Sequence, residues 1–394
     1  MAEAGGDGAL TLRRLQAADV EAYKRLRGHS FGFPAGDDTD AAFRSRMPTT
    51  VGAFDDAQRL VASATGHRLE TYVAGRVRPL LGVAAVQTEP AARRRGLARR
   101  LVHTLLEDAR GAGVGWGMLY PFDPAFYARL GWQALPTGVR LRLPIAALGA
   151  PSRTDAQALE GAAGPRLDAL YARCAAHWNF TDARTQNPWD AWEDLQTDAG
   201  ERVAAFDLGD AYAVVRLRTA ATVTTLEVRD ALWCSSQGRE ALLRLLRSYH
   251  GQAEQVELEV PRDDALAWSW GDWYATATNA TRMLRVIDVQ AALAGLPYPH
   301  DARSLTLRVR DGGAAWNDAT WRLAAGDEGC SVTPATGVAD VEVDVRALAL
   351  VVGGVSTPNA LRLAGVVEGD DKALDVLAAL AGGRSAYHAL NDRF

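Results

Sequence analysis

The chain has 394 residues, of which 48% are hydrophobic and 23% are charged, and it carries a formal net charge of -5. A chain of this length divides into two or three domains, and this composition excludes wholesale disorder. The acidic balance excludes a general electrostatic attraction to nucleic acid or to an anionic membrane.

Cysteine usage and apolar runs exclude further classes of protein. Cys174, Cys234 and Cys330 are odd in number and far apart in the sequence, which argues against a disulfide framework and a tetrahedral zinc site, so we expect no metal. Residues 1–8 lack the basic start and apolar stretch of a signal peptide. The longest apolar run, near residues 347–352, is too short to span a bilayer. We therefore expect a cytoplasmic protein.

The first part of the chain alternates between strand and helix patterns. Residues 80–86 form an apolar run typical of a strand buried on both faces, and Pro90 ends it. Apolar residues then recur at helical spacing from residue 97 to 109, and Gly111 closes the helix. Strands are expected at residues 10–15, 60–64, 69–73 (after a break at Gly66), 78–88, 118–120 and from 132, and helices at 17–26, 97–111 and 124–130.

A linker separates this part from a second one with a similar layout. Residues 136–165 are rich in Ala, Gly and Pro, and we place a boundary near Pro151. Beyond it, helices are expected at residues 166–178, 188–196 and 238–249, and strands at 202–206, 211–217, 224–229 and 255–260. This part lacks an arginine- and glycine-rich junction between strand and helix.

The last part of the chain has a different pattern. Residues 283–292 indicate a strand that enters a helix and links to the last part. Alternating strands are expected at residues 305–309, 319–323, 330–333 and 341–345, with helices around residue 348 and at 370–380. Strands followed by helices are typical of an α+β module.

The junction after strand 78–88 reads Arg93-Arg94-Arg95-Gly96-Leu97-Ala98. A helix N-terminus exposes unpaired N–H groups and a positive dipole end, which suits a pyrophosphate. Gly96 allows close approach of the backbone, and arginines at a helix start are unfavourable unless an anion binds or they face water. The alternatives are a solvated helix start that binds nothing and a site for another nucleotide. A Walker loop is excluded, because the Gly-Lys-Ser/Thr ending is missing.

Residues 86–90, followed by Arg93-x-x-Gly96-x-Ala98, resemble the coenzyme A signature of the GNAT acetyltransferases. The fuller match is to GNAT enzymes of the enhanced-intracellular-survival (Eis) type, which carry a motif similar to residues 127–132, Tyr-Ala-Arg-Leu-Gly-Trp. The segment 282–293 resembles the family's entry to its last domain, and the chain ends in Phe394 as family members end in phenylalanine.

This resemblance implies an α/β and α+β fold, with tandem GNAT-like domains of mixed sheets flanked by helices, followed by an α+β domain like sterol carrier protein 2. We expect an N-terminal GNAT domain that binds acetyl-CoA at residues 1–150 and a central GNAT-like domain without the cofactor signature at 151–285. The sterol-carrier-protein-2-like domain, with a catalytic C-terminus, would occupy residues 286–394. Relatives assemble as homo-oligomers, often hexamers, so a similar assembly is expected.

The resemblance also assigns roles to single residues. The acetyl and pantetheine arm of acetyl-CoA, the co-substrate, would lie along Val86, Gln87 and Thr88. The pyrophosphate cradle would consist of Arg94, Arg95, Gly96, Leu97, Ala98 and Arg99. Phe122 and Asp123 occupy positions that contact the cofactor arm in relatives, where the family usually has Ser-Glu.

Acetyl transfer to an amine needs a neutral amine, a stabilised oxyanion and a protonated leaving thiolate. By resemblance, Tyr127 is the acid, and the α-carboxylate of Phe394 folds back into the site as the base. A free tyrosine has a pKa of about 10 and starts protonated, and burial would raise the pKa of an α-carboxyl and make it a better base. From the residues alone, Tyr127 can equally be a packing residue and the terminus a frayed tail. Relatives often carry an acidic residue before the terminal Phe, where this chain has Arg393.

Three functions are consistent with these features. The first is an N-acetyltransferase acting on a primary amine of a small molecule such as an aminoglycoside or polyamine. The second is a regulatory protein or a protein that binds a small apolar ligand, in which the GNAT domain is vestigial. The third is a protein lysine acetyltransferase. Other bases or pocket walls to consider are His29, His103, His388, residues 31–34, Trp178, Trp189 and Trp192.

Overall fold

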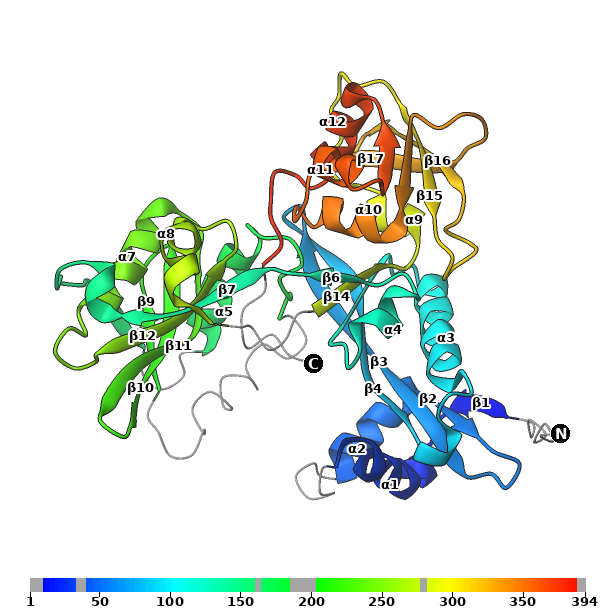
Figure 1. Cartoon of the computed structure of the whole chain (residues 1–394), viewed down its shortest axis with the longest axis horizontal. Coiled ribbons are helices and arrows are strands. Elements are labelled where there is room, and N and C mark those ends of the chain that lie inside the picture. Colours follow the sequence, from blue (N-terminus) through cyan, green and yellow to red (C-terminus); the bar gives the residue numbers. More distant parts are fainter. Residues whose placement is uncertain (1–9, 33–39, 160–163, 185–202, 277–281, 388–394) are drawn as a thin grey trace.

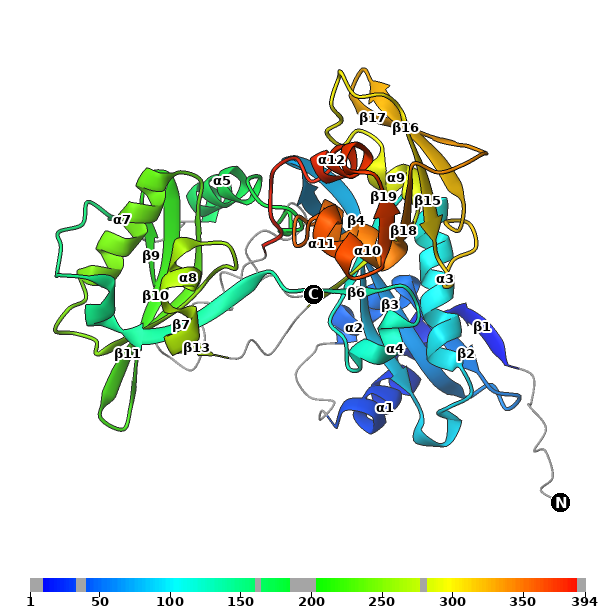
Figure 2. The same ribbon diagram turned by 45° about the horizontal axis from the view of Figure 1, so that its top comes forward.

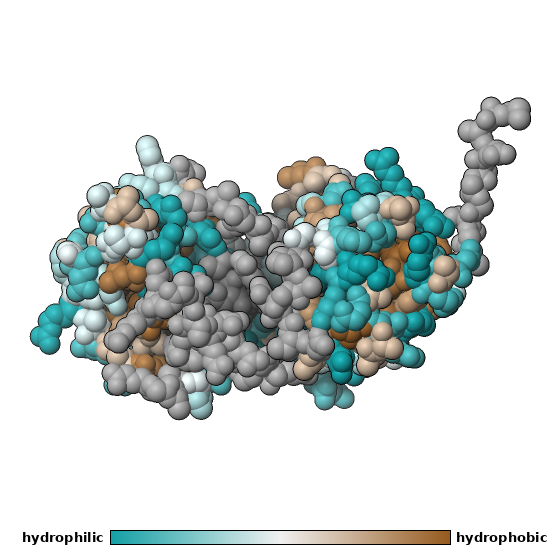
Figure 3. Space-filling view, turned by 90° about the horizontal axis from the view of Figure 1, so that it is seen from below, coloured by the Kyte–Doolittle hydropathy of each residue, from teal (hydrophilic) through white to brown (hydrophobic). Residues whose placement is uncertain are grey.

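The structure is a computed structural model that describes residues 10–32, 40–159, 164–184, 203–276 and 282–387. Its described strands form three sheets, two of seven strands and one of five. The second sheet and its helices form one lobe, and the first and third sheets form the other (Figure 1). Viewed from below, both lobes expose a mixture of hydrophilic and hydrophobic residues (Figure 3). No helix in the described part of the chain is long and apolar enough to cross a membrane.

The first sheet has the strand order β1-β2-β3-β4-β5-β14-β6. These strands are β1 (Thr11–Arg14), β2 (Thr50–Phe54), β3 (Leu60–Val73), β4 (Arg76–Thr88), β5 (Trp116–Leu119), β14 (Arg282–Val286) and β6 (Gln133–Leu135). Helix α3 (Leu97–Gly111) covers one face, where its apolar stripe packs with Val51 and Ala53. The helices α1 (Val20–Phe31) and α2 (Asp40–Arg46) lie on the other face, against Phe54. This division follows from the alternation of side chains along β2.

The expected break at Gly66 is wrong, because β3 runs without interruption from Leu60 to Val73. Helix α3 crosses the sheet at this point, and a Cβ built on Gly66 would lie 3.1 Å from the side chain of Leu105. Gly66 is therefore a close-approach residue within a strand rather than a turn residue.

The second sheet has the strand order β13-β7-β12-β11-β10-β9-β8. Its strands are β7 (Gly138–Pro144), β8 (Gln157–Leu159), β9 (Ala204–Asp207), β10 (Ala211–Ala220), β11 (Val223–Trp233), β12 (Gln255–Pro261) and β13 (Ala275–Thr276). The helices are α5 (Gly164–Ala175), α7 (Ser236–Arg247) and α8 (Ala265–Tyr274). Helix α8 was not expected, because its apolar residues do not recur in a clear helical stripe. The helix expected at 188–196 lies outside the described residues.

Two strands pair in a different sheet from the one that the expected domain limits assign to them. Strand β7 precedes the limit at residue 150, yet it pairs with β12 in the second sheet. Strand β14 begins before the limit at residue 285, yet it lies between β5 and β6 in the first sheet. The limit near residue 150 was placed from composition and the limit at residue 285 from the family resemblance, and neither carries information about which short strands pair.

The third sheet has the strand order β17-β16-β15-β18-β19. It consists of β15 (Leu305–Arg310), β16 (Thr320–Gly326), β17 (Gly329–Pro334), β18 (Val341–Asp344) and β19 (Val367–Gly369). The helices are α9 (Val289–Leu293), α10 (Val345–Val352), α11 (Pro358–Leu363) and α12 (Asp371–Ala379). The expected α+β module is confirmed, with α11 as an additional helix.

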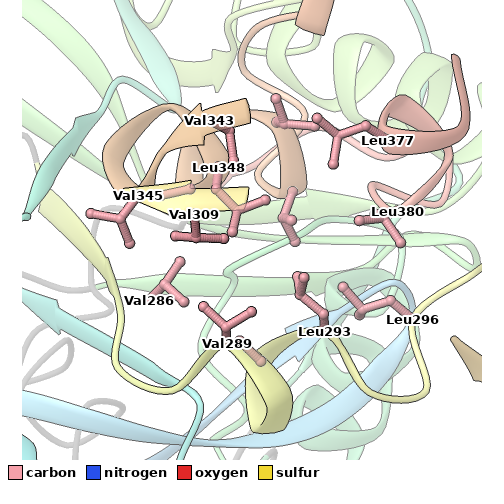
Figure 4. Packing of buried hydrophobic residues seen from close by; sticks show 14 of the residues in the cluster. Val286, Val289, Leu293, Leu296, Val309, Val343, Val345, Leu348, Leu377 and Leu380 are labelled. Carbon is pink, nitrogen blue, oxygen red and sulfur yellow. The ribbon is translucent and has the colours of Figure 1, made fainter. Parts of the chain in front are cut away.

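The core of this module continues into the first sheet. Leu348, Leu377 and Leu380 are at most 1% exposed, and they belong to one cluster with Trp116 and Val286 of the first sheet. Figure 4 shows Val286, Val289, Leu348 and Leu380 packed around one centre. Apolar side chains fill this region, so the two sheets stabilise each other.

A buried ion pair joins the two sheets as well. Arg285 on β14 and Asp311 after β15 both have fully buried side chains, and their closest atoms lie 2.6 Å apart. Asp311 also accepts hydrogen bonds from the Gly313 N–H and the Asn317 side chain. Burial lowers the pKa of Arg285 while the Asp311 carboxylate opposes that effect.

Replacing Asp311 by alanine is expected to destabilise the protein by about 3–5 kcal/mol, because Arg285 would remain buried without its partner charge. Denaturant-induced unfolding measures this loss. Glu368, whose side chain is 71% exposed and 3.7 Å from Arg310, provides the matched control. Glu368→Ala should change the free energy of unfolding by less than about 1 kcal/mol. Equal losses for the two variants would contradict a structural role for the buried pair.

Candidate active site

Strand β4 separates from β5 at the point where the expected cofactor arm would lie. The two strands pair in parallel only from Leu80 opposite Trp116 to Val83 opposite Leu119. Beyond Val83, β4 stays paired with β3 but carries an extra residue, and Ala85 has a positive φ of 47°. Among the described residues, this bulge and the end of pairing with β5 leave one backbone edge of β4, next to Val86 and Thr88, without a partner strand. An extended ligand can bind to that edge through backbone hydrogen bonds.

The turn after β4 presents the start of α3 to the same region. Gly96 is the N-cap of α3, with a φ of 73°, and no side chain caps the helix. Arg94 also has a positive φ, of 63°. A Cβ built on Gly96 would meet no heavy atom within 4 Å. The N-terminus of α3 is therefore open, and its N–H groups are available to an anion.

Most of the expected cofactor-binding residues lie together around this opening. Arg94, Arg95 and Arg99 are exposed, Ala98 is half-buried, and Leu97 is buried in the core. Arg93 turns back and donates to the Thr88 carbonyl, which ties the turn to the end of β4. An open helix start, a ring of arginines and an unpaired strand edge fit a pyrophosphate followed by an amide-bearing arm.

Gln87 has a different place from its two neighbours. Its side chain is 2% exposed and donates to the Ser63 hydroxyl of β3, at 2.8 Å. Its side-chain oxygen is buried without a partner among the described residues. Gln87 can therefore contact a ligand at the unpaired edge of β4 only through its backbone, and not through its side chain.

The short helix α4 (Pro124–Ala128) follows β5 and lies next to α3 (Figures 1 and 2). The carboxylate of Asp123 caps it by accepting from the N–H groups of Ala125 and Phe126. Asp123 thus serves as a helix cap, a role that its family position did not suggest. Phe122 is 64% exposed and stacks on Phe126, with ring centroids 5.5 Å apart.

Tyr127 is the buried residue of α4. It is 2% exposed and contacts the rings of Phe122, Phe126 and Trp132 at centroid distances of 5.3, 5.0 and 6.3 Å. Burial raises the pKa of the Tyr127 phenol well above its ordinary value. The side chain is therefore held rigidly and protonated, as an acid requires.

The segment from Asn179 to Ala183 links this region to the end of the chain. Its backbone bonds to β3, with Tyr72 N–H donating to the Thr181 carbonyl and Phe180 N–H to the Tyr72 carbonyl. On its other side, Asn179 N–H donates to the Ser385 carbonyl. The fully buried Asn179 side chain donates to carbonyl groups of the last module and accepts from the Ala74 N–H. We refer to residues 179–183 as the clamp.

The clamp holds the last described residues of the chain. Tyr387 N–H donates to the Asn179 carbonyl, and the Thr181 hydroxyl donates to the Tyr387 carbonyl. In Figures 1 and 2, the red segment after α12 runs from the third sheet toward the space between the lobes. Phe394 and His388 lie outside the described residues, so the structure does not place the expected base.

Residues that the sequence did not single out connect the clamp to the end of β5. The Arg282 guanidinium, 1% exposed, makes a bidentate pair with Asp182 of the clamp at 2.6 and 2.9 Å. Arg282 also donates to the hydroxyl of Tyr120, the residue after β5. A buried arginine in an apolar strand requires an acidic partner. The position of Arg282 in such a strand was the only feature of the sequence that pointed to this ion pair.

The other expected residues lie elsewhere or have structural roles. Trp178 packs against Trp233 and Tyr387, so it is a core residue. His29 bonds to the Glu89 carboxylate at 3.1 Å, and His103 pairs with Glu107 on α3. Trp189, Trp192 and residues 33–34 lie outside the described residues. The described residues contain no group of three or more His, Cys, Asp or Glu that could hold a metal ion.

The helix start in the second sheet that corresponds to α3 is closed. Ser235 caps α7 by accepting from the Gly238 N–H at 3.0 Å. A Cβ built on Gly238 would lie 2.3 Å from the carbonyl oxygen of Asp210. The chain itself therefore occupies the space that is open at Gly96.

Comparison with known proteins assigns these parts. Two models, each described as an acetyltransferase (GNAT) domain, match residues 11–135 and 172–286, and a sterol carrier protein domain model matches residues 289–389. An uncharacterized N-acetyltransferase of Streptomyces coelicolor is 26% identical over 296 residues, covering 70% of this chain and 71% of the relative. Another, of Streptomyces avermitilis, is 25% identical over 343 residues, covering 78% of this chain and 80% of the relative.

Solved structures share the whole fold. Eis1 from Mycobacterium abscessus aligns with a TM-score of 0.80 and 24% identity, covering 98% of this chain and 100% of that one. A GCN5-related N-acetyltransferase from Anabaena variabilis also has a TM-score of 0.80, with 19% identity, and covers 96% of this chain and 99% of that one. The chain thus belongs to the GNAT acetyltransferases and combines two GNAT domains with a C-terminal sterol carrier protein domain in the fold that Eis1 also has.

Proposed function

We propose that the chain transfers the acetyl group of acetyl-CoA to a primary amine of a small molecule, such as an aminoglycoside or a polyamine, at the first GNAT domain. The observation that carries this proposal is the combination of an open α3 N-terminus with the unpaired edge of β4. The corresponding helix start at Gly238 is closed, which supports one cofactor site per chain. By resemblance, the chain works as a homo-oligomer, of which a hexamer is the expected form.

Acetyl-CoA supplies the activated acetyl thioester when bound. The turn residues Arg94, Arg95 and Arg99 and the N–H groups of α3 would hold the pyrophosphate. The backbone at Val86 to Thr88 would bind the arm, and its N–H groups would stabilise the developing oxyanion.

Tyr127 would protonate the sulfur of the departing thiolate. Its aromatic neighbours hold the ring and exclude water. Since burial raises the pKa of the phenol, Tyr127 stays protonated at neutral pH and would donate its O–H to the leaving sulfur as the C–S bond breaks.

The α-carboxylate of Phe394 would accept the proton of the attacking amine. The clamp supports this role, because it holds Tyr387 beside Asp182, whose partner Arg282 bonds to Tyr120 at the end of β5. Phe394 follows seven positions after Tyr387, and seven residues reach at most about 25 Å. The α-carboxylate of Phe394 therefore lies within about 25 Å of Tyr387.

The two alternative functions, binding of an apolar ligand and acetylation of a protein lysine, require different structural features. Binding of an apolar ligand by the last domain needs an apolar cavity, whereas Leu348, Leu377 and Leu380 fill the centre of that domain. Acetylation of a protein lysine would use the same cofactor site, so only the acceptor distinguishes it from small-molecule transfer.

A thiol-release assay with acetyl-CoA and a panel of amines tests the proposal. Release of coenzyme A that depends on an aminoglycoside or a polyamine would support it. Release only with peptides that contain lysine would favour protein acetylation. Absence of acetyl-CoA binding by calorimetry would overturn the acetyltransferase function at this site.

Replacing Gly96 by alanine should weaken acetyl-CoA binding by about tenfold or more, because a methyl group would project into the phosphate cradle and the left-handed backbone would be strained. Calorimetric titration measures the change in Kd. Gly113, near the other end of α3, has a φ of 76° and equally open surroundings. Gly113→Ala therefore carries the same strain without the methyl in the cradle, and its Kd should stay unchanged. Similar losses in the two variants would contradict the cradle.

A further inference from the structure

Two cysteines that lie far apart in the sequence meet in the second lobe. Cys174 lies on α5, and Cys234 lies between β11 and the Ser235 cap of α7. Both thiols contact the same acceptor, the carbonyl oxygen of Asp210, with sulfur–oxygen distances of 3.7 and 3.4 Å. The Cys234 thiol is also close enough to raise the pKa of the Cys174 thiol. They are therefore direct neighbours.

The two cysteines differ in their access to solvent. Cys174 is fully buried in a cluster with Tyr171, Tyr212 and Leu232. Cys234 is only partly buried. A reagent in solution can thus reach the thiol of Cys234, whereas the thiol of Cys174 is shielded from solvent.

Metal binding does not explain this pair. Zinc and similar ions take three or four protein ligands, and the residues that the structure describes contain no cluster of three or more His, Cys, Asp or Glu. Neither cysteine belongs to the proposed transfer site in the first domain. Two adjacent thiols can be oxidised to a disulfide by exchange with a disulfide reagent.

We propose that Cys174 and Cys234 are an oxidisable thiol pair, which closes to a disulfide on reaction with a low-molecular-weight disulfide such as oxidised glutathione. The Cys234 thiolate attacks one sulfur of the reagent, forms a mixed disulfide and releases one reduced thiol. Cys174 then loses its proton and attacks the Cys234 sulfur, which releases the second reduced thiol. Two protein thiols and one glutathione disulfide are thereby converted into one protein disulfide and two reduced glutathione molecules.

The second step is expected to be slow and faster at high pH. Burial and the neighbouring Cys234 raise the pKa of the Cys174 thiol, and only the thiolate attacks. Since the raised pKa keeps the thiolate scarce at neutral pH, raising the pH increases the rate of ring closure. The first step, at the accessible Cys234, precedes it.

The disulfide would join α5 to the junction between β11 and α7. These elements flank β10, which packs against both helices, and the bridge would close a chain loop of about 60 residues. Closing a loop of this size restricts the unfolded chain, so oxidised protein should show a melting temperature about 5 °C higher.

Thiol counting and peptide mapping of the folded protein provide the test. After oxidised glutathione is added, titration in denaturant should show a fall from the three cysteines of the sequence to one free thiol per chain. Mapping without reductant should find one cross-linked peptide that joins Cys174 to Cys234. Cys330, which is buried and whose pKa burial raises to about 12, should stay reduced.

Two serine variants distinguish a specific Cys174–Cys234 disulfide from unspecific oxidation of thiols. Cys330→Ser should form the bridge as the wild type does, whereas Cys174→Ser should stop at the mixed disulfide on Cys234. Three free thiols after prolonged oxidation at pH 9, a mixed disulfide that never closes in the wild type, or a bridge to Cys330 would each overturn the proposal. The wild type and Cys330→Ser alone decide the question if Cys174→Ser does not fold.

Discussion

Tyr127→Phe should lower kcat by about 100-fold or more and leave the affinity for acetyl-CoA close to that of the wild type. The substitution removes only the hydroxyl, and the ring contacts with Phe122, Phe126 and Trp132 can persist. The leaving thiolate would then depart without an acid. Stopped-flow and steady-state thiol release measure kcat, and calorimetry measures the Kd.

The pH dependence provides a second measurement of the same role. Burial raises the pKa of the Tyr127 phenol above its ordinary value of about 10. The acidic form therefore persists to higher pH than in a free tyrosine, so loss of activity through ionisation of Tyr127 should not occur below about pH 10. Tyr249→Phe is the matched control, since burial also raises the pKa of this tyrosine and it lies in the second lobe. An unchanged kcat in Tyr127→Phe would refute the acid role.

Adding one residue after Phe394 should lower kcat by about 100-fold as well, with the melting temperature and acetyl-CoA affinity unchanged. The addition converts the α-carboxylate into a neutral amide and moves the new carboxylate by about 3.5 Å. The clamp would still hold Tyr387, because its hydrogen bonds involve residues before the altered end. Such a loss would therefore report on the base and not on the fold.

A one-residue addition before Met1 is the control of equal length. It should leave kcat unchanged. If the C-terminally extended protein turned over at the wild-type rate, the base would have to be another group, and the half-exposed His29 beside Glu89 would be tested next. The thiol-release assay with the responsive amine from the panel measures both variants.

Helices and turns that depend on a short stretch of sequence could be predicted from hydrophobic periodicity and motifs. Helix α3 was expected at its observed bounds, because its apolar residues recur at helical spacing and pack on the sheet. The Arg93 to Ala98 turn was expected at an exposed helix start, where the structure places it. Family resemblance, rather than periodicity, singled out Tyr127 as more than a packing residue.

Pairings between distant segments could not be predicted. The places of β7 and β14 depend on partners more than 100 residues away, and Arg282 and Asp182 lie 100 residues apart. The sequence separation of Cys174 and Cys234 argued against a framework of disulfides, yet α5 and β11 bring the two thiols together. Asp123 illustrates the reverse case, since a local signal, the Pro124 that follows it, indicates the helix cap, whereas the family position indicates a contact with the cofactor arm.

The place of β14 has a consequence for synthesis of the protein on the ribosome. Among the described strands, β6 pairs with β14 alone, and β14 begins at Arg282, long after β6 ends at Leu135. At ordinary elongation rates, about 7–30 s pass between translation of these two strands. During that interval the edge of β5 has no partner strand, and Trp116 and Met118 lack the third-sheet core that covers them. The first GNAT domain, although it comes first in the gene, can complete its fold only after the second lobe has emerged.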